Sequence, residues 1–391
     1  MIQPEGLPSR EELLNRAEAL VPTLRGRALE TEKLRRLPAS TLEDLRRTGL
    51  VSIVQPASGG GLERSLTDLL EATATVARGC GSTGWCFGVM AVHNWLVGLF
   101  PEAAQREVFE NPRPSFAAVF APMGKSDPAE GGVRLSGRWS FASGCDNGDW
   151  VAVCGKLTGE APDLLMHLVP KSDFTIDDTW FVAGLRGTGS KDIVIDDVFV
   201  PQHRTMSLIQ AAMGNCPGHA VNDGPLFRVT FTGALTIALA GAALGIAEGA
   251  IEAFQEQLQK RVFVFTGQKQ KQQPASQLRL AEAAAEVDAA RLLVMDACKR
   301  MDRDATDGEV PDEASRVRYR RNASYAVRLC TRAVDRLFEA SGGGGLRDDA
   351  PLQRAFRDLH AVGAHAILVW DTSAEIAGRH MVGLELGPVM I

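Results

Sequence analysis

The sequence has few of the groups that would cross-link the chain or hold a metal ion. Its 391 residues include 7 cysteines and 7 histidines, with no C-x-x-C pair and no H-E-x-x-H motif. An odd cysteine count without paired spacing is typical neither of a disulfide framework nor of a zinc site. We therefore expect reduced cysteines and no metal site, as in a cytoplasmic protein.

Signals for export, for nucleic-acid binding and for a membrane anchor are also weak. The first twenty residues, MIQPEGLPSREELLNRAEAL, lack a basic segment followed by an apolar run, so no secretory signal is predicted. The formal net charge of -6 argues against binding nucleic acid through a general basic field. Residues 231–251 form an apolar run long enough to span a membrane. Because this run is rich in Ala and Gly and is followed by Glu252, we expect a buried helix instead.

The hydrophobic periodicity changes twice along the chain. Residues 10–112 repeat apolar side chains every three or four positions, which predicts helices, with a capping box at Ser40 and Glu43. From about residue 115 to residue 222, short alternating segments separated by Gly, Pro and Asp predict strands in a small sandwich or barrel. Helical periodicity then returns and predicts an up-down bundle. The expected bundle helices are 230–262, 275–304, 312–341 and 352–377.

This order of segments predicts an α+β fold with separate units. We expect an N-terminal helical domain over 1–112, a β domain over 113–222 and a C-terminal helical bundle over 223–391. No G-x-G-x-x-G motif stands between a predicted strand and a predicted helix, so a Rossmann-type nucleotide site is not expected.

Four segments together resemble the acyl-CoA dehydrogenase superfamily, in the order in which that family has them. They are GRWSFASGCDNGDWV (137–151), GLRGTGSKDIVIDDVFVP (184–201), AEAAAEVDAARLLV (281–294) and SGGGGLRDDAPLQRAFRDL (341–359). The resemblance extends over nearly the whole chain. It implies an acyl-CoA dehydrogenase-like fold with a small β-barrel or sandwich between two helical parts.

The glutamate that dehydrogenases of this family use as a catalytic base is missing from its usual position. Those enzymes abstract a proton with a glutamate soon after the R-D pair, and here that position is Ala366. No Asp or Glu lies between Asp358 and Asp371, so the usual base is absent. The residue just before this position is His365, and a histidine here resembles the pattern of the group D two-component flavin monooxygenases. That branch includes 4-hydroxyphenylacetate, secosteroid and dibenzothiophene monooxygenases.

The resemblance implies a cofactor and a partner. Such enzymes take reduced flavin, FMNH2 or FADH2, from a separate NAD(P)H:flavin reductase and react it with O2 to a C4a-hydroperoxide, which hydroxylates a small electron-rich substrate. The resemblance also implies a homotetramer, the usual oligomeric state in this family. Within this resemblance the catalytic candidates are His93, Ser143 and His365. A histidine of near-neutral pKa suits acid–base catalysis, and a serine hydroxyl suits a hydrogen bond to flavin N5.

The remaining candidates are larger sets. The cofactor-binding candidates are Trp139, Phe141, Ser143, Gly144, Thr188, Arg261, Gly343 and Gly344. The substrate-binding candidates are Trp85, Phe120, Trp180, Phe227 and Trp370, which would suit a hydrophobic core equally well. Two alternatives stay open at this stage. One is a flavin dehydrogenase acting on an acyl thioester, and the other is a non-catalytic helical scaffold of the same fold.

Overall fold

A computed structural model of the chain describes residues 7–159, 163–263, 265 and 267–387. Helices precede and follow a strand-rich segment, which confirms the α+β prediction. The helices are α1 (Arg10–Leu34), α2 (Ala39–Thr48), α3 (Leu66–Gly79), α4 (Gly81–Val97), α5 (Glu102–Val108), α6 (Leu208–Ala212), α7 (Phe231–Lys260), α8 (Pro274–Asp307), α9 (Glu313–Ser341), α10 (Pro351–Gly363) and α11 (Trp370–Met381). Two short 3-10 turns matter for the site, η5 (Arg186–Thr188) and η10 (Gly343–Leu346).

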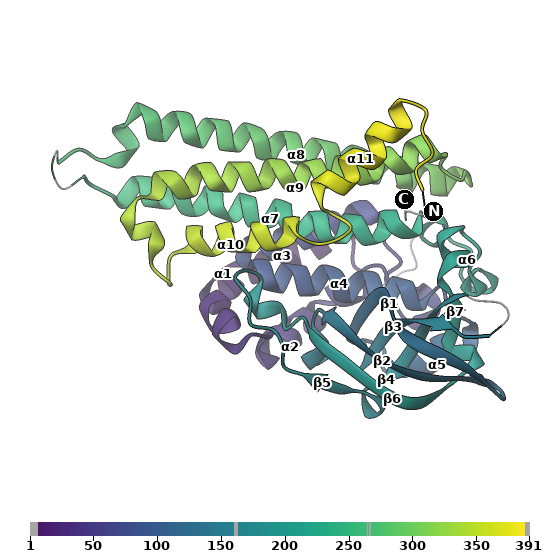
Figure 1. Cartoon of the computed structure of the whole chain (residues 1–391). Coiled ribbons are helices and arrows are strands. Elements are labelled where there is room, and N and C mark those ends of the chain that lie inside the picture. Colours follow the sequence, from purple (N-terminus) through teal and green to yellow (C-terminus); the bar gives the residue numbers. More distant parts are fainter. Residues whose placement is uncertain (1–6, 160–162, 264, 266, 388–391) are drawn as a thin grey trace.

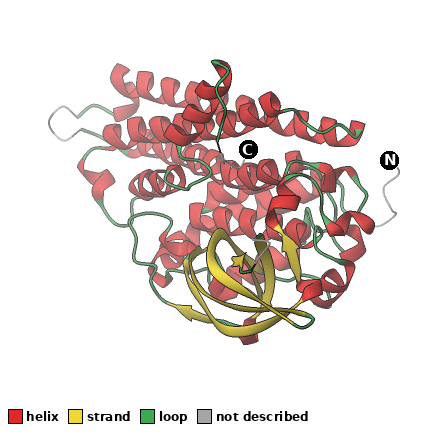
Figure 2. Cartoon of the chain, turned by 45° about the vertical axis from the view of Figure 1, so that its right-hand side comes forward, coloured by secondary structure: helices red, strands yellow, loops and turns green. Residues whose placement is uncertain are grey.

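The described strands form one curled sheet. They are β1 (Phe116–Ala129), β2 (Gly132–Ala142), β3 (Trp150–Leu157), β4 (Leu164–Pro170), β5 (Thr175–Asp177), β6 (Lys191–Pro201) and β7 (Thr205–Ser207). The strand order is β5-β6-β2-β1-β3-β4-β7, and of these neighbours only β1 and β3 run parallel. Figure 2 shows how strongly the strands curve around one another. The sheet encloses its own apolar core, which includes Trp139, Val151 and Ile193.

The two helical parts of the chain share a single hydrophobic core. It extends from α1, α3 and α4 into α7, α8, α9 and α10. In Figure 1, α4 lies between the bundle and the strands, so it contributes to both layers. The long apolar helix predicted from residues 231–251 is α7, and 83% of its most apolar window is buried inside the protein. Gly245 allows its close approach to α3, because a Cβ there would overlap the carbonyl oxygen of Ala74.

Three local predictions differ from the structure. Ser40 does not cap α2, because the helix begins at Ala39 and Pro38 occupies the capping position without a side-chain bond. The first alternating segment that predicts a strand begins at residue 133, so β1 is missing from the prediction. The helix predicted over 352–377 is two helices, with a break at residues 364–369 that contains His365. Inside the break, the N–H groups of Leu368 and Val369 both donate to the carbonyl of His365, at 2.8 and 2.9 Å.

Candidate active site

Ser143 lies just after β2, where the strand leaves its regular pairing. The register between β2 and β6 shifts near this end of the strand, and Phe141 has a φ of 70°. Such irregularities change the direction in which the following side chains point. Gly144 turns the chain with a φ of 78°, and its N–H donates to the carbonyl of Thr188 at 2.9 Å. This bond fixes the end of β2 against the turn η5.

A chain of hydrogen bonds begins at the Ser143 hydroxyl. The indole N–H of Trp85 donates to Ser143 Oγ at 3.0 Å, and Ser143 Oγ lies 2.8 Å from Ser190 Oγ. Ser190 Oγ lies 2.7 Å from Thr188 Oγ1, which donates to the carbonyl of Leu185 at 2.9 Å. Thr188 is only 1% exposed, so it acts inside the protein, whereas Ser143 stays partly accessible.

The turn that carries Thr188 is anchored by α10. The buried carboxylate of Asp358 accepts the N–H of Leu185 at 2.6 Å, and burial raises the pKa of this carboxyl to about 6. The neighbouring Arg357 pairs with Glu32 of α1 at 2.6 Å. At Gly184 a side chain would overlap the carbonyl oxygen of Arg357, so glycine is required there. The R-D pair recognised in the sequence therefore positions the turn beside Ser143.

His93 lies on α4, eight residues after Trp85, and is buried. Its Nδ1 lies 3.4 Å from the carbonyl oxygen of Phe116, and burial lowers its pKa to about 4. The ring is therefore neutral at neutral pH, and a carbonyl partner favours the tautomer with the proton on Nδ1. This leaves Nε2 as a hydrogen-bond acceptor. The ring stands edge-on to Phe120 at 6.0 Å, and Phe120 in turn stands edge-on to Phe231 at 5.7 Å.

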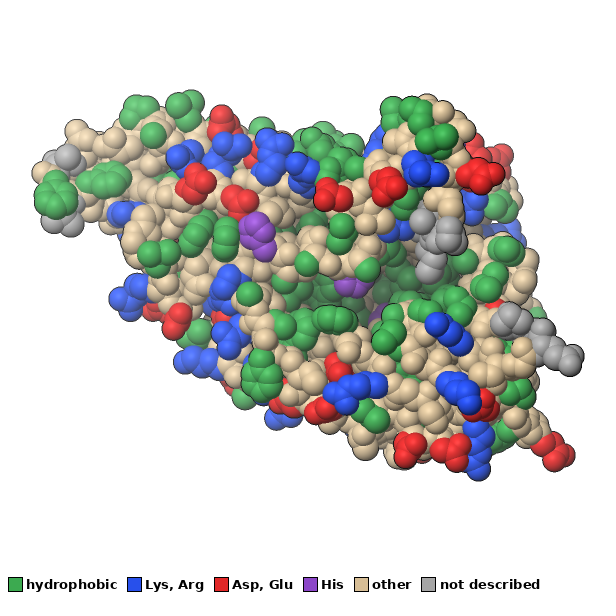
Figure 3. All heavy atoms as spheres, viewed as in Figure 1, with side chains coloured by type: hydrophobic (Ala, Val, Ile, Leu, Met, Phe, Trp, Pro, Cys, Tyr) green, Lys and Arg blue, Asp and Glu red, His purple; other side chains and the backbone are tan. Residues whose placement is uncertain are grey.

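His365 lies beside Trp85 and comes from the break between α10 and α11. Its ring centroid lies 5.5 Å from that of Trp85, at 64°. Solvent reaches the side chain, yet surrounding protein still lowers its pKa to about 4. These two observations agree if the ring lies in a recess. Figure 3 shows a hollow between the bundle and the strand layer, lined mainly by hydrophobic side chains with histidine at its bottom.

An exposed aromatic wall stands close to Ser143. Phe141 is 71% exposed, and its ring stands at 89° to that of Trp180 with centroids 6.1 Å apart. Trp180 donates its indole N–H to the carbonyl of Leu185 at 3.1 Å. The guanidinium of Arg35 lies 4.0 Å from the ring centre of Phe181, which is 73% exposed. Large aromatic side chains that lie together and are exposed to solvent in this way form a candidate surface for binding another molecule.

The structure separates three of the predicted residues from this place. Trp139 is fully buried in the sheet, where its indole N–H donates to the carbonyl of Cys154 at 2.7 Å. Phe227 is 2% exposed and fills the space beside Gly98. Trp370 packs against a tyrosine of α9 with ring centroids 4.9 Å apart. All three contribute to packing, so we do not include them in the site.

Arg261 and the glycines that follow α9 lie together, away from Ser143. Arg261 donates to the carbonyl of Ser341 at the end of α9, and its guanidinium lies against Gly342. Gly343 and Gly344 are exposed, with open space where a Cβ would stand. They lie in the turn between α9 and α10, at the end of the bundle far from the strands (Figure 1). A cation beside unhindered backbone N–H groups suits an anion.

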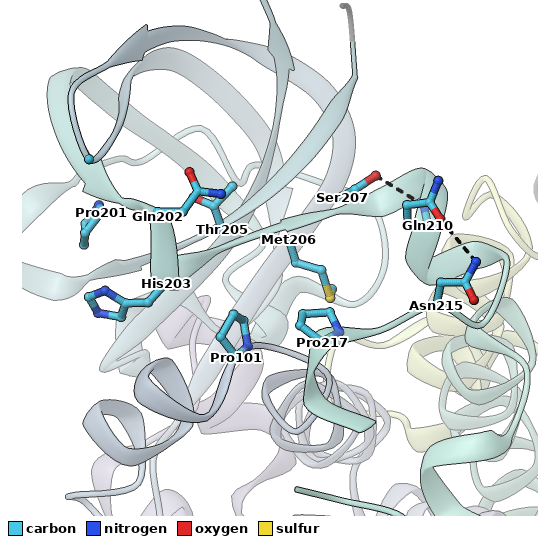
Figure 4. Close-up of a pocket in the computed structure, with 11 residues that line it drawn as sticks. Pro101, Pro201, Gln202, His203, Thr205, Met206, Ser207, Gln210, Asn215 and Pro217 are labelled. Carbon is cyan, nitrogen blue, oxygen red and sulfur yellow. Dashed lines mark hydrogen bonds between the residues drawn. The ribbon is translucent and has the colours of Figure 1, made fainter. Parts of the chain in front are cut away.

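The structure also contains a separate groove that is lined by other residues. It has a volume of about 710 Å³ and is lined by the ends of β6 and β7, by α6 and by two prolines, Pro101 and Pro217 (Figure 4). Two of its polar side chains bond to each other, since Asn215 donates to Gln210 at 3.2 Å. None of the predicted site residues lines it. Among the described residues no group of three or more His, Cys, Asp or Glu is placed to hold a metal ion.

Three residues of the site were not identified from the sequence. Ser190 lies two residues after Thr188 in the segment GLRGTGSKDIVIDDVFVP, and its place in that motif was the signal that could have identified it. Asp358 was recognised only as part of a motif. Phe231 begins the apolar helix α7 and had no distinguishing pattern.

Comparison with known proteins identifies the fold that carries these residues. The sequence profile described as "Acyl-CoA dehydrogenase, C-terminal domain" matches residues 237–370. The crystal structure of 3-HSA hydroxylase from Rhodococcus sp. RHA1 matches with a TM-score of 0.93 and 35% identity, over 97% of this chain and 99% of that one. The protein therefore has the acyl-CoA dehydrogenase-like fold that the motifs predicted.

Two curated relatives define the branch. The flavin-dependent monooxygenase oxygenase subunit HsaA of Mycobacterium tuberculosis is 38% identical over 97% of this chain and 98% of its own length. The FADH(2)-dependent resorcinol hydroxylase oxygenase component of Rhizobium sp. is also 38% identical, over 98% and 97%. This chain belongs to the same family, the oxygenase components of two-component flavin-dependent monooxygenases. It is an oxidoreductase that uses reduced flavin and O2 with a small-molecule substrate and a separate reductase.

The residues present fit such a cofactor. A flat ring requires an apolar surface, which Phe141 and Trp180 offer, and a polar edge, which the Ser143 hydroxyl offers. Gly343 and Gly344 leave room for a phosphate to approach the backbone. Membership of this family favours the monooxygenase over both alternatives, since these relatives are named as monooxygenases or hydroxylases.

Proposed function

We propose that this oxygenase hydroxylates a phenolic aromatic substrate in the hollow formed by Trp85, His93, Phe120, Phe231 and His365. Two relatives act on phenols by name, resorcinol in one and p-hydroxyphenylacetate in the other. The observation that carries the proposal is the presence of two neutral histidines beside aromatic side chains: His365 beside Trp85, whose indole bonds Ser143, and His93 beside Phe120. An apolar pocket with a few convergent polar groups is typical of sites for small aromatic ligands.

His93 is proposed as the proton acceptor for the phenol. Its Nε2 lone pair accepts the phenolic O–H and orients the ring. A pKa near 4 is too low to ionise a phenol before reaction, since a phenol has a pKa near 10. Once oxygen adds to the ring, however, the phenol becomes a dienone-like cation whose O–H is strongly acidic, and a weak base then suffices. His365 is proposed as the second proton-handling group at the same ring.

Ser143 and the aromatic wall are proposed to hold the flavin ring. The reduced flavin supplies the electrons that activate O2, and the chain must keep water away from it. Phe141 and Trp180 cover a ring face, while Gly144 and Thr188 hold the backbone on which Ser143 stands. Phe141 has a φ of 70°, which is unusual for a bulky residue and suits a functional position.

Arg261, Gly343 and Gly344 are proposed to receive the phosphate or adenylate end of a flavin from a neighbouring subunit. Within one chain they lie at the N-terminal end of α10, whereas Asp358, which touches the Ser143 site, lies in the C-terminal half of that helix.

We propose a homotetramer, supported by an exposed apolar stripe on α8. Leu278 and Leu292 of this stripe are 65% and 72% exposed. A NAD(P)H:flavin reductase is proposed as the electron source, and the cytoplasm as the compartment, in line with seven free thiols.

Rapid mixing of the anaerobic protein and reduced FMN or FAD with O2 and a panel of phenols tests the function. We expect hydroxylated product in place of H2O2 for at least one phenol. His93→Ala and His365→Ala should lower product per flavin oxidised and raise H2O2. His360→Ala is the matched control, because His360 bonds Asp335 on the bundle surface. Equal H2O2 release from all four proteins with every phenol would contradict the proposal.

A further inference from the structure

One set of hydrogen-bond directions satisfies every contact of the hydroxyl chain at Ser143. A carbonyl oxygen has no proton, so Thr188 Oγ1, at 2.9 Å from the Leu185 carbonyl, must donate its proton there. Thr188 then has no proton left for Ser190, so Ser190 donates to Thr188 at 2.7 Å. Ser190 in turn has none left for Ser143, and Ser143 donates to Ser190 at 2.8 Å.

The other partner of Ser143 imposes the same direction. An indole N–H is only a donor, so Trp85 uses one lone pair of Ser143 Oγ at 3.0 Å. The proton of Ser143 is committed to Ser190, and one lone pair of its oxygen remains. Ser143 therefore offers a ligand an acceptor and no donor.

The backbone holds the carbonyl acceptor at the end of this hydroxyl chain in place. Leu185 has a φ of 51°, and its N–H is held by the buried carboxylate of Asp358 at 2.6 Å. The Leu185 carbonyl also accepts the N–H of Thr188 at 3.1 Å and the indole N–H of Trp180 at 3.1 Å. Its orientation is thus fixed from several sides, and the direction of the whole chain is set at this carbonyl.

We propose that Thr188 and Ser190 act as positioning residues that make Ser143 select flavin carrying a proton on N5. Reduced flavin has an N5–H, which is a donor and matches the free lone pair of Ser143. Oxidised flavin has a bare N5, which is an acceptor and faces another acceptor. This inference rests on the proposed place of the flavin ring, and it gives the preference for reduced flavin a cause in this chain's own residues.

Two substitutions release the proton of Ser143 and should weaken the preference. Ser190→Ala removes the acceptor that holds this proton. Thr188→Val keeps the shape of the side chain but lets Ser190 donate to Ser143, so that Ser143 can donate outward. Thr188→Ser is the matched control, because it keeps the hydroxyl.

Anaerobic titration of each protein with oxidised and with reduced FAD gives the ratio of the two dissociation constants. One neutral hydrogen bond corresponds to a change of about 3- to 10-fold. We expect the ratio of the oxidised to the reduced constant to fall by about this factor in Ser190→Ala and Thr188→Val, and to stay at the wild-type value in Thr188→Ser. The ¹⁵N shift of labelled N5 in bound oxidised flavin should move toward a hydrogen-bonded value only in the first two variants.

The outcomes separate this inference from the proposed function. A wild type that binds neither form of flavin overturns the proposed site. A wild type that prefers reduced flavin, with variants that weaken both forms equally, overturns the role of Thr188 and Ser190 and leaves the site intact. Circular dichroism and thermal unfolding establish that each variant is folded before titration.

Discussion

Replacing Asp358 by Asn should remove a specific pH dependence of stability. This carboxyl is 4% exposed, and burial raises its pKa from 3.8 to about 6, although Arg354 and Arg357 oppose the shift. A pKa raised on folding means that the folded state holds the proton more tightly than the unfolded chain. The stabilisation is therefore fully present below pH 4 and is lost as the pH rises to about 6. The change in free energy of unfolding is about 3 kcal/mol.

The amide of Asn keeps an oxygen for the N–H of Leu185 and has no proton to lose. Urea unfolding at several pH values between 4 and 7.5 should show that the wild type loses about 3 kcal/mol more than Asp358→Asn over this range. Asp358→Ala is the contrasting variant. It leaves the buried N–H of Leu185 without its partner, which costs about 1–3 kcal/mol at every pH. Parallel pH profiles for the wild type and Asp358→Asn would refute the assignment of this carboxyl as a buried, largely protonated group at low pH.

Four further results are expected. Since burial lowers the pKa of His93 to about 4, product yield per flavin should stay level from pH 8 down to about 5 and fall below that, whereas a midpoint near 6.5 would contradict a buried neutral ring. Gly184→Ala should weaken binding of reduced flavin by at least about tenfold, because the new methyl displaces the turn from α10, and unchanged binding would show that the turn does not hold Ser143. Arg261→Ala should weaken FAD more than FMN in equilibrium titrations if it meets the adenylate end, and equal losses would place it elsewhere. Leu292→Glu should shift the sedimentation coefficient toward smaller species, and an unchanged value would remove the α8 stripe from the interface.

Much of the secondary structure follows from local pattern. The helical periodicity predicted within residues 10–112 is confirmed by helices such as α3, because apolar spacing is a local feature. The last helix was predicted too long, since no Pro marks the break at 364–369 and the break is stabilised by bonds to the carbonyl of His365. Ser40 failed as a cap for a related reason, because a capping sequence one residue inside a helix looks the same as one at its start.

The candidate site was also predicted in part: motifs identified some of its residues, whereas the direction of their side chains depended on packing. Ser143, Gly144 and Thr188 were predicted through their motifs, and the structure brings them together. Trp139 belongs to the same motif, yet alternation along the strand turns its side chain into the sheet while the irregularity after it turns Phe141 outward. Whether an aromatic side chain faces a core or a cavity depends on what packs across from it, which a linear pattern does not contain.

The sequence by itself determined the helix–strand–helix order, the family and the residue types available for chemistry, because periodicity and motif spacing are local properties of the chain. Only the tertiary structure decided what Ser143 can do. Its partners Trp85 and Ser190 are 58 and 47 residues away, and the direction of their hydrogen bonds is fixed by a carbonyl held from α10. A hydroxyl is a donor or an acceptor according to its neighbours, and folding alone supplies those neighbours.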